Sequence, residues 1–214
     1  MKDRIAIAVF ALIFSAAMIG TASAEGVSFT AKFGVDVIGE AEVEYGDPVN
    51  EGETGDVKNG FSLALEGLMD FQSFMVGMGV SYLLPRGIDE DSPTTPDGKF
   101  STLPIYAVLN VPFRGGELVP FIAVQLGYNF LFIDSDMKKW YEAFAQANGY
   151  PDTSVSAKGG LYYAFGGGLI FANNIQAELL YRVHKNKIKL EASTDTLEID
   201  DEYSHVTLSI GYRF

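Results

Sequence analysis

Apolar residues alternate with small or polar residues along most of this chain, and this two-residue period constrains the fold more than any other feature. Successive side chains of a β-strand point to opposite faces of a sheet, so strict alternation predicts strands whose two faces meet different surroundings. Within residues 121–132, the polar parity holds Ala123, Gln125, Gly127 and Asn129, and the other parity is apolar. The predicted strands are 27–44, 58–71, 73–84, 101–113, 119–132, 159–171, 175–190 and 203–214.

The connections between these strands alternate in length. Tight turns are predicted near 70–73, 114–118 and 172–174, where glycine, asparagine and charged residues gather. The other connections are longer and rich in Asp, Glu, Gly, Pro, Ser and Thr. Short turns at one end and long loops at the other indicate an antiparallel up-and-down meander, and neither a linker nor a repeat suggests a second domain.

Alternation alone also fits a soluble sandwich or a lipocalin-like barrel, but the polar parity carries full charges in mid-strand. Lys32, Asp36, Glu66, Glu178 and Arg182 all lie on it, mixed with glycines, which suits the narrow interior of an eight-stranded barrel. The apolar parity is aromatic near the strand ends, as at membrane interfaces. Closure satisfies every backbone group of strands in lipid. The sequence therefore predicts an all-β, eight-stranded antiparallel transmembrane β-barrel with short periplasmic turns and long extracellular loops.

The N-terminus has the three parts of a secretory signal peptide. Lys2 and Arg4 precede the apolar stretch 5–19, and the small residues Ala22 and Ala24 follow it. The apolar stretch is short for a membrane span, although an uncleaved anchor is the alternative. We expect cleavage after Ala24, so residues 1–24 are the signal peptide and residues 25–214 form the barrel domain.

Composition excludes several classes of function. The formal net charge of −13 argues against nucleic-acid binding, which requires a basic surface. The absence of cysteine removes disulfides, thiol catalysis and zinc–cysteine sites. The acidic segments 47–56, 89–97 and 191–202 match no EF-hand spacing, although divalent cations could bridge them to anionic lipopolysaccharide. We expect no cofactor and no resident metal.

The C-terminal residues resemble the assembly signal of bacterial outer-membrane β-barrels. This resemblance rests on the terminal Phe214, the aromatic Tyr212 two positions earlier, and the apolar Val206, Leu208 and Ile210. The chain as a whole is similar to the small eight-stranded barrels: the OmpA transmembrane domain, OmpX, OmpW and the opacity-type adhesins. The resemblance implies a porin-like monomer in the outer membrane of a Gram-negative cell. Its implied partners are the lipid bilayer, lipopolysaccharide, periplasmic chaperones and the barrel-assembly machinery.

Polar residues opposite the lipid-facing parity should fill the lumen. Opposite charges in a dry, narrow barrel are expected to pair, because an unpaired buried charge is very costly, and an eight-stranded interior is just filled by side chains. The favoured reading is a polar plug. The predicted lumen network comprises Lys32, Asp36, Glu40, Glu66, Gln125, Asn129, Glu178, Arg182, His184, His205 and Arg213.

Two other functions stay open at this point. The OmpW resemblance implies a narrow channel for small or hydrophobic solutes, although OmpW-type lumens are apolar. A lipid-modifying enzyme is the third reading, but the His184-Lys185-Asn186 segment lacks the serine of the deacylase pattern. We therefore expect no enzyme activity.

The third long loop differs from the acidic ones. Residues 137–147 combine helix formers with a Lys138–Glu142 pair at i,i+4 spacing, and Asn148-Gly149 follows as a helix stop. This predicts a short helix that either packs on the barrel mouth or contacts a surface partner. The candidate contact residues are Trp140, Tyr141 and Phe144. The leading hypothesis is a non-enzymatic structural or surface-interaction protein with an unidentified outside partner.

Overall fold

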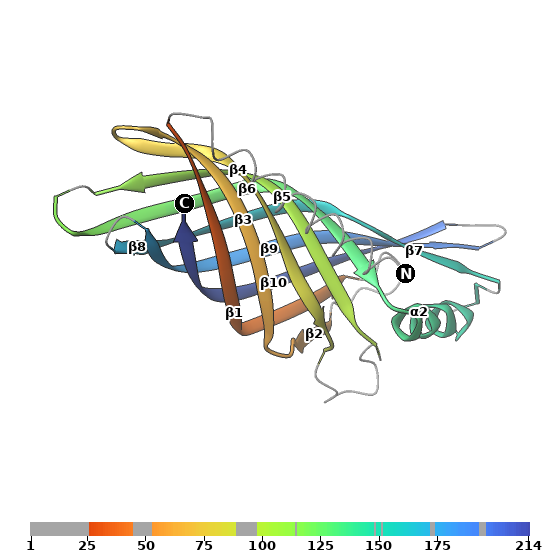
Figure 1. The fold of residues 1–214 in the computed structure, drawn as a ribbon. Coiled ribbons are helices and arrows are strands. Elements are labelled where there is room, and N and C mark those ends of the chain that lie inside the picture. The colour runs from red at the N-terminus through yellow and green to blue at the C-terminus, as the bar shows by residue number, and fades with distance from the viewer. Residues whose placement is uncertain are drawn as a thin grey trace.

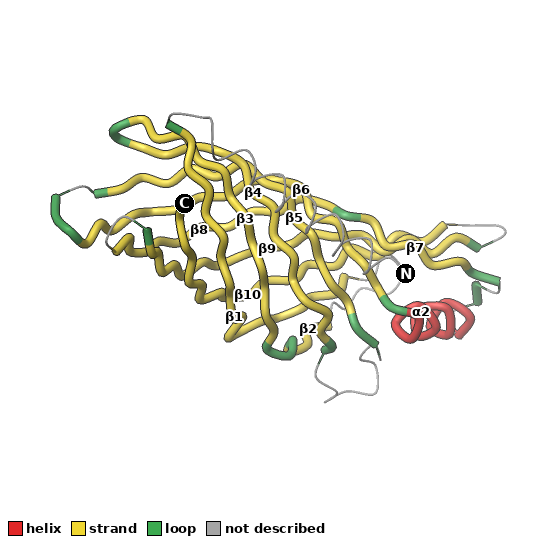
Figure 2. Tube along the Cα trace, in the orientation of Figure 1, coloured by secondary structure: helices red, strands yellow, loops and turns green. Residues whose placement is uncertain are grey.

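The computed structural model describes residues 26–44, 53–88, 98–113, 115–147, 149–150, 152–171, 174–192 and 196–214. The predicted signal peptide and the acidic-loop residues 47–52 and 89–97 lie outside these ranges. Most described residues lie in antiparallel strands (Figure 2). The strands are β1 (Val27–Glu44), β2 (Glu53–Asp56), β3 (Gly60–Phe71), β4 (Phe74–Arg86), β5 (Phe100–Pro112), β6 (Leu118–Ile133), β7 (Ser154–Lys158), β8 (Gly160–Phe171), β9 (Ile175–Glu191) and β10 (Thr196–Arg213). The helix is α2 (Ser135–Ala147).

Pairing between the first and last strands closes the sheet into a barrel (Figure 1). Strand β10 is hydrogen-bonded to β1 on one side and to β9 on the other. The short strands β2 and β7 continue the positions of β3 and β8, because β2 and β3 both pair with β1 and β7 and β8 both pair with β9. The barrel therefore has eight strand positions, and the predicted eight-stranded antiparallel fold is confirmed.

The two ends of the barrel differ, as the loop lengths predicted. The end that carries the turns between β3 and β4, β5 and β6, and β8 and β9 is called the turn end. There Phe71 lies opposite Phe74, and Phe214 exchanges backbone hydrogen bonds of 3.0 and 2.9 Å with Phe29. The other end, called the loop end, carries α2, β2 and β7 (Figure 1). Phe214 thus takes part directly in closing the barrel.

The β9–β10 hairpin is longer than predicted. Strand β10 begins at Thr196, which pairs with Glu191, whereas the sequence analysis began this strand at residue 203. The acidic residues of this stretch suggested a loop, but the buried pair Ile188 and Ile199 maintains the alternation on the inner face. On the outer face, oppositely charged side chains pair across the two strands, as Lys185 does with Glu202. Long strands therefore raise one wall of the barrel beyond its apolar surface.

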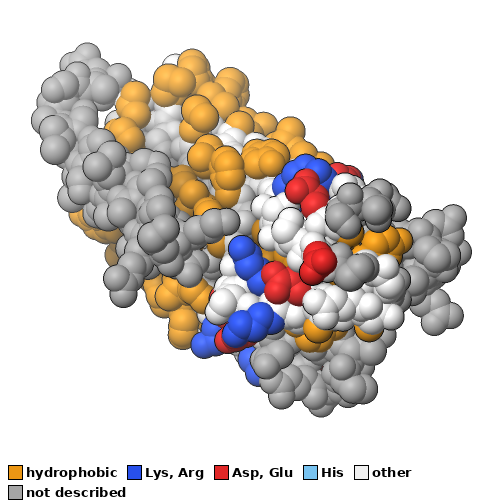
Figure 3. Space-filling model, turned by 90° about the vertical axis from the view of Figure 1, so that its right-hand side faces the viewer, with side chains coloured by type: hydrophobic (Ala, Val, Ile, Leu, Met, Phe, Trp, Pro, Cys, Tyr) orange, Lys and Arg blue, Asp and Glu red, His pale blue; other side chains and the backbone are white. Residues whose placement is uncertain are grey.

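The outer surface of the barrel wall is apolar over most of its length. Its exposed residues include Phe33, Ile38, Phe61, Met78, Phe113, Ile122, Leu126, Phe165, Leu179, Leu208, Ile210 and Tyr212. Near the loop end the outer face becomes charged, with Lys185 at 2.9 Å from Glu202 and Lys187 at 3.1 Å from Asp200. Figure 3 shows hydrophobic side chains over one part of the described surface and mixed charges over another. No helix in the described ranges is long and apolar enough to cross a membrane.

Candidate functional site

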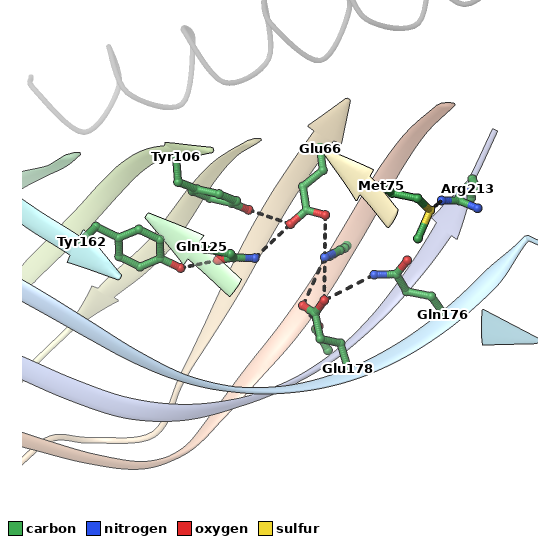
Figure 4. Close-up of polar contacts among 10 residues, drawn as sticks. Glu66, Met75, Tyr106, Gln125, Tyr162, Gln176, Glu178 and Arg213 are labelled. Carbon is green, nitrogen blue, oxygen red and sulfur yellow. Dashed lines mark hydrogen bonds and ion pairs between the residues drawn. The ribbon is translucent and has the colours of Figure 1, made fainter. Parts of the chain in front are cut away.

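A buried ion-pair cluster occupies the centre of the lumen, where three strands place one charged side chain each. Lys32 from β1 lies between Glu66 from β3 and Glu178 from β9 (Figure 4 shows the two carboxylates). Its Nζ is 2.7 Å from Glu66 Oε2 and 2.9 Å from Glu178 Oε2. All three side chains are almost fully buried. Each charge therefore has an opposite charge in contact, as burial of ions requires.

Neutral polar groups extend this cluster across the barrel. The hydroxyl of Tyr106 and the amide of Gln125 each donate a hydrogen bond of 3.1 Å to Glu66 Oε1. The hydroxyl of Tyr162 donates to Gln125 Oε1 at 2.6 Å, so these side chains form a continuous chain (Figure 4). Such networks stabilise a unique interior arrangement when their members are satisfied. Residues from β5, β6 and β8 are thereby linked to the ion pairs of β1, β3 and β9.

Glycines on the inward face make room for these large side chains. A Cβ atom on Gly79 would lie 2.5–2.8 Å from the ring and hydroxyl of Tyr106, and one on Gly60 would lie 2.5–2.9 Å from the guanidinium of Arg86. Real Cβ contacts are not that short. The glycines of the polar parity therefore belong to the packing of the polar interior, not to a solvent-exposed face.

A second ion pair lies closer to the loop end. The Arg86 guanidinium contacts the Asp36 carboxylate, and both are buried. Arg86 Nη1 also donates to the Tyr203 hydroxyl at 2.9 Å, and the Thr207 hydroxyl donates to Asp36 Oδ1 at 2.5 Å. His205 Nε2 lies 3.5 Å from the same Asp36 oxygen. Strands β1, β4 and β10 meet at this group.

Arg86 and Tyr203 were absent from the predicted lumen residues. Arg86 was read as part of an acidic loop, and Tyr203 stood at the predicted start of its strand. The β4–β5 register shifts between Leu83 and Arg86, which places Arg86 inside the barrel. Simple alternation cannot reveal such a shift, although an arginine two residues beyond a predicted strand was an available signal.

The predicted position of Glu40 in the lumen was wrong. The pairing of β1 with β10 shifts between Asp36 and Ile38, so one extra residue, Val37, interrupts the alternation. Such a β-bulge moves every later side chain to the opposite face. Glu40 is accordingly exposed, whereas Lys32 and Asp36, which precede the bulge, are buried.

The structure places most other predicted lumen residues inside the barrel. Gln125, Asn129, Glu178, Arg182, His184 and His205 are all buried. Asn129 Nδ2 donates to Asn186 Oδ1 at 2.6 Å, and Asn186 donates to Asp201 at 3.4 Å. Arg213 is only half-buried, at the turn end, where its Nη2 lies 2.7 Å from Met75 Sδ (Figure 4). The network is therefore centred on Lys32 and Asp36, and Arg213 stands outside that centre.

Apolar layers lie on both sides of the polar centre. On the turn-end side, inward side chains of five strands pack together: Leu68, Met75, Val108, Phe121 and Ile170. On the loop-end side, a second apolar cluster includes Leu83, Phe100, Leu131, Ile188, Leu190, Ile199 and Tyr203. The ion-pair cluster therefore lies between two groups of apolar side chains along the barrel axis.

Helix α2 packs on the loop-end cluster. Met137, Tyr141 and Ala145, spaced four residues apart, form its buried face. Asp134 caps the helix, because its Oδ1 accepts hydrogen bonds from the backbone N–H groups of Asp136 at 3.1 Å and Met137 at 2.9 Å. The predicted helix is thus present, and it begins at Ser135, two residues earlier than expected.

The predicted contact residues of this helix fall on two faces. Tyr141 is buried against the barrel mouth. Trp140 and Phe144 are half-buried, with their rings stacked at 5.5 Å between centroids and 10° between planes. The helix therefore packs on the mouth through one face, and it also keeps an aromatic pair partly accessible.

The proposed assembly-signal residues form an outward stripe on β10. Leu208, Ile210 and Tyr212 are exposed, and Val206 and Phe214 are half-buried. None of the described residues form a cluster of three or more His, Asp or Glu side chains suited to a metal ion. The described part of the barrel thus has an apolar outer wall and a charged, hydrogen-bonded interior.

Comparison with known proteins agrees with this arrangement. Among solved structures, the chain is similar to OprG from Pseudomonas aeruginosa, with 14% identity, a TM-score of 0.53, and 88% of this chain and 96% of that chain covered. It is also similar to AlkL, with 16% identity, a TM-score of 0.53, and coverages of 90% and 93%. No curated protein gives a significant sequence match. A family model described as "Outer membrane protein beta-barrel domain" matches residues 6–214. The chain therefore belongs to the outer membrane protein β-barrel domain family, which is a family of the bacterial outer membrane.

Proposed function

We propose that this outer-membrane barrel is a non-enzymatic structural or surface-interaction protein whose lumen is plugged. The observation that carries the proposal is the position of the buried ion-pair cluster between two groups of apolar side chains. Lys32 contacts both Glu66 and Glu178 at 2.7–3.1 Å, so each of these charges is already held by an opposite charge. In this reading the ion pairs hold opposite walls of the barrel together.

The loop end supports the surface role. Helix α2 is fixed by three buried side chains and presents the stacked pair Trp140 and Phe144. Aromatic side chains on rigid elements are common anchors of protein interfaces. We propose that this end faces the exterior of the cell and that the aromatic pair contacts the outside partner.

Electrical recording tests the plug directly. The purified protein, reconstituted in planar lipid bilayers, should give no steady ion conductance at any applied voltage that the bilayer tolerates. A variant in which residues 136–147 are replaced by a short Gly–Ser linker should stay equally silent, because the ion-pair cluster and the turn-end apolar layer would remain. Steady open-channel currents from the wild-type protein would refute the plug and favour a channel.

Mass spectrometry tests the non-enzymatic reading. Lipid A from cells that express the protein should have the same acyl-chain masses as lipid A from cells with an empty vector. In the lumen, Ser209 Oγ donates to Glu178 at 3.4 Å, and the nitrogens of His205 make no hydrogen bond within the described residues. A serine held this way is not activated by histidine. A reproducible loss or gain of an acyl chain would overturn the proposal.

A further inference from the structure

Among the described residues, one buried cation of the lumen makes no ion pair with a carboxylate. Lys32 contacts two carboxylates and Arg86 contacts Asp36. Arg182 on β9 is 1% exposed, and its Nε and Nη1 atoms have no hydrogen-bond partner within the described residues. Arginine stays charged in proteins, so this guanidinium must be compensated in some other way.

Two histidines whose ring nitrogens make no hydrogen bond within the described residues adjoin Arg182. His205 on β10 is directly opposite Arg182, and His184 lies two residues further along β9, on the same inward face. Their rings stack with centroids 5.1 Å apart, and both side chains are fully buried. No nitrogen of either ring makes a hydrogen bond in the described part of the chain, although His205 Nε2 approaches Asp36 Oδ1 at 3.5 Å.

The charges of the interior are unevenly placed. Three buried carboxylates, those of Asp36, Glu66 and Glu178, face three buried cations. Two of the carboxylates gather on Lys32, which leaves negative charge at that point and positive charge at Arg182. Water bound at Arg182 would satisfy its N–H groups but would not balance its charge.

We propose that Arg182, His184 and His205 form an internal binding site for a small monovalent anion of the halide class. The guanidinium supplies fixed positive charge and several N–H donors, and each imidazole can add one N–H donor. The filled interior of an eight-stranded barrel admits only a small ligand. Because apolar layers lie on both sides, the anion enters during folding or local opening and exchanges slowly.

A ligand that binds only the folded barrel stabilises it by mass action. Wild-type protein should therefore resist urea better in sodium bromide or chloride than in sodium gluconate of equal ionic strength, since gluconate is too large for the site. Above the dissociation constant, each tenfold rise in halide should lower the unfolding equilibrium constant by about tenfold. Arg182→Met should abolish this difference, whereas Lys139→Gln, which removes an exposed cation on α2, should retain it.

Crystallography of the wild-type protein grown in sodium bromide gives an independent result, even if Arg182→Met fails to fold. An anomalous bromide peak within hydrogen-bond distance of Arg182, together with halide-specific stabilisation, is the expected outcome. Water alone at Arg182, with equal stability in halide and gluconate, would overturn the proposal. Halide-specific stabilisation with bromide bound only elsewhere would overturn it as well.

Discussion

Replacing Lys32 with methionine would leave two buried carboxylates without their cation. The Lys32 side chain is 1% exposed and contacts both acids at 2.7–3.1 Å. After its removal, neither solvent nor another described cation is in position to compensate the two carboxylates. Removing one partner of a buried ion pair costs about 3–5 kcal/mol, and the cost arises from the charge left behind. We expect Lys32→Met to lower the free energy of unfolding by about this amount.

A rescue experiment separates charge from packing. If uncompensated charge is the cause, Lys32→Met combined with Glu66→Gln and Glu178→Gln should recover most of the lost stability, because a neutral replacement of a buried ion pair is often near neutral.

The assay is urea unfolding in lipid vesicles, followed by the gel-mobility shift of the folded barrel on heating. Lys139→Met is the matched control, since its side chain is 72% exposed and its pair with Asp136 is screened by water. A loss below about 1 kcal/mol in Lys32→Met, or a triple variant no more stable than the single one, would refute the argument that charge compensation holds the lumen together.

Four further substitutions test three other features of the barrel. Gly79→Ala should displace the Tyr106 ring and lower the unfolding free energy by about 1–3 kcal/mol, measured by urea unfolding, and unchanged stability would mean that the ring yields freely. Asp36→Asn should cost about 3–5 kcal/mol while Glu40→Gln has no measurable effect, and equal effects would contradict the bulge between them. Tyr141→Ala should cost about 3 kcal/mol and increase protease cleavage near α2, and an uncleaved, equally stable variant would contradict its packing on the mouth.

The sequence was sufficient to predict the barrel because the alternation follows from the two different surroundings of its wall, which are lipid outside and a polar lumen inside. Outward residues such as Leu126 and Ile210 meet lipid and inward ones such as Gln125 meet other polar groups, so period two holds along most of each strand. Asp200 and Glu202, which pair with Lys187 and Lys185 of the predicted strand 175–190, were misread as loop residues. Above the apolar surface both partners face water, and polarity alone does not distinguish such a strand from a loop.

The candidate site was predictable in membership but not in pairing. Lys32, Glu66 and Glu178 were expected in the lumen, whereas their mutual contact depends on the relative register of β1, β3 and β9. Glu40 was wrongly placed in the lumen, and Arg86 was not predicted there. Both errors have one cause, because each residue lies beyond an irregularity in its strand. Alternation locates a side chain only relative to its neighbours, so a single inserted residue changes every later assignment.

The raised wall formed by β9 and β10 has a consequence for recognition. This wall continues as a sheet beyond the apolar surface, and its inner face contributes Ile188 and Ile199 to the loop-end cluster. Helix α2 packs on the same cluster through Met137, Tyr141 and Ala145. The aromatic pair on the helix is thus displayed on a rigid platform instead of a mobile loop. Because the barrel surface is already ordered, binding of a molecule there would cost little conformational entropy of the barrel. The affinity would then depend on the quality of the contacts, and the selectivity on the fixed shape of the surface.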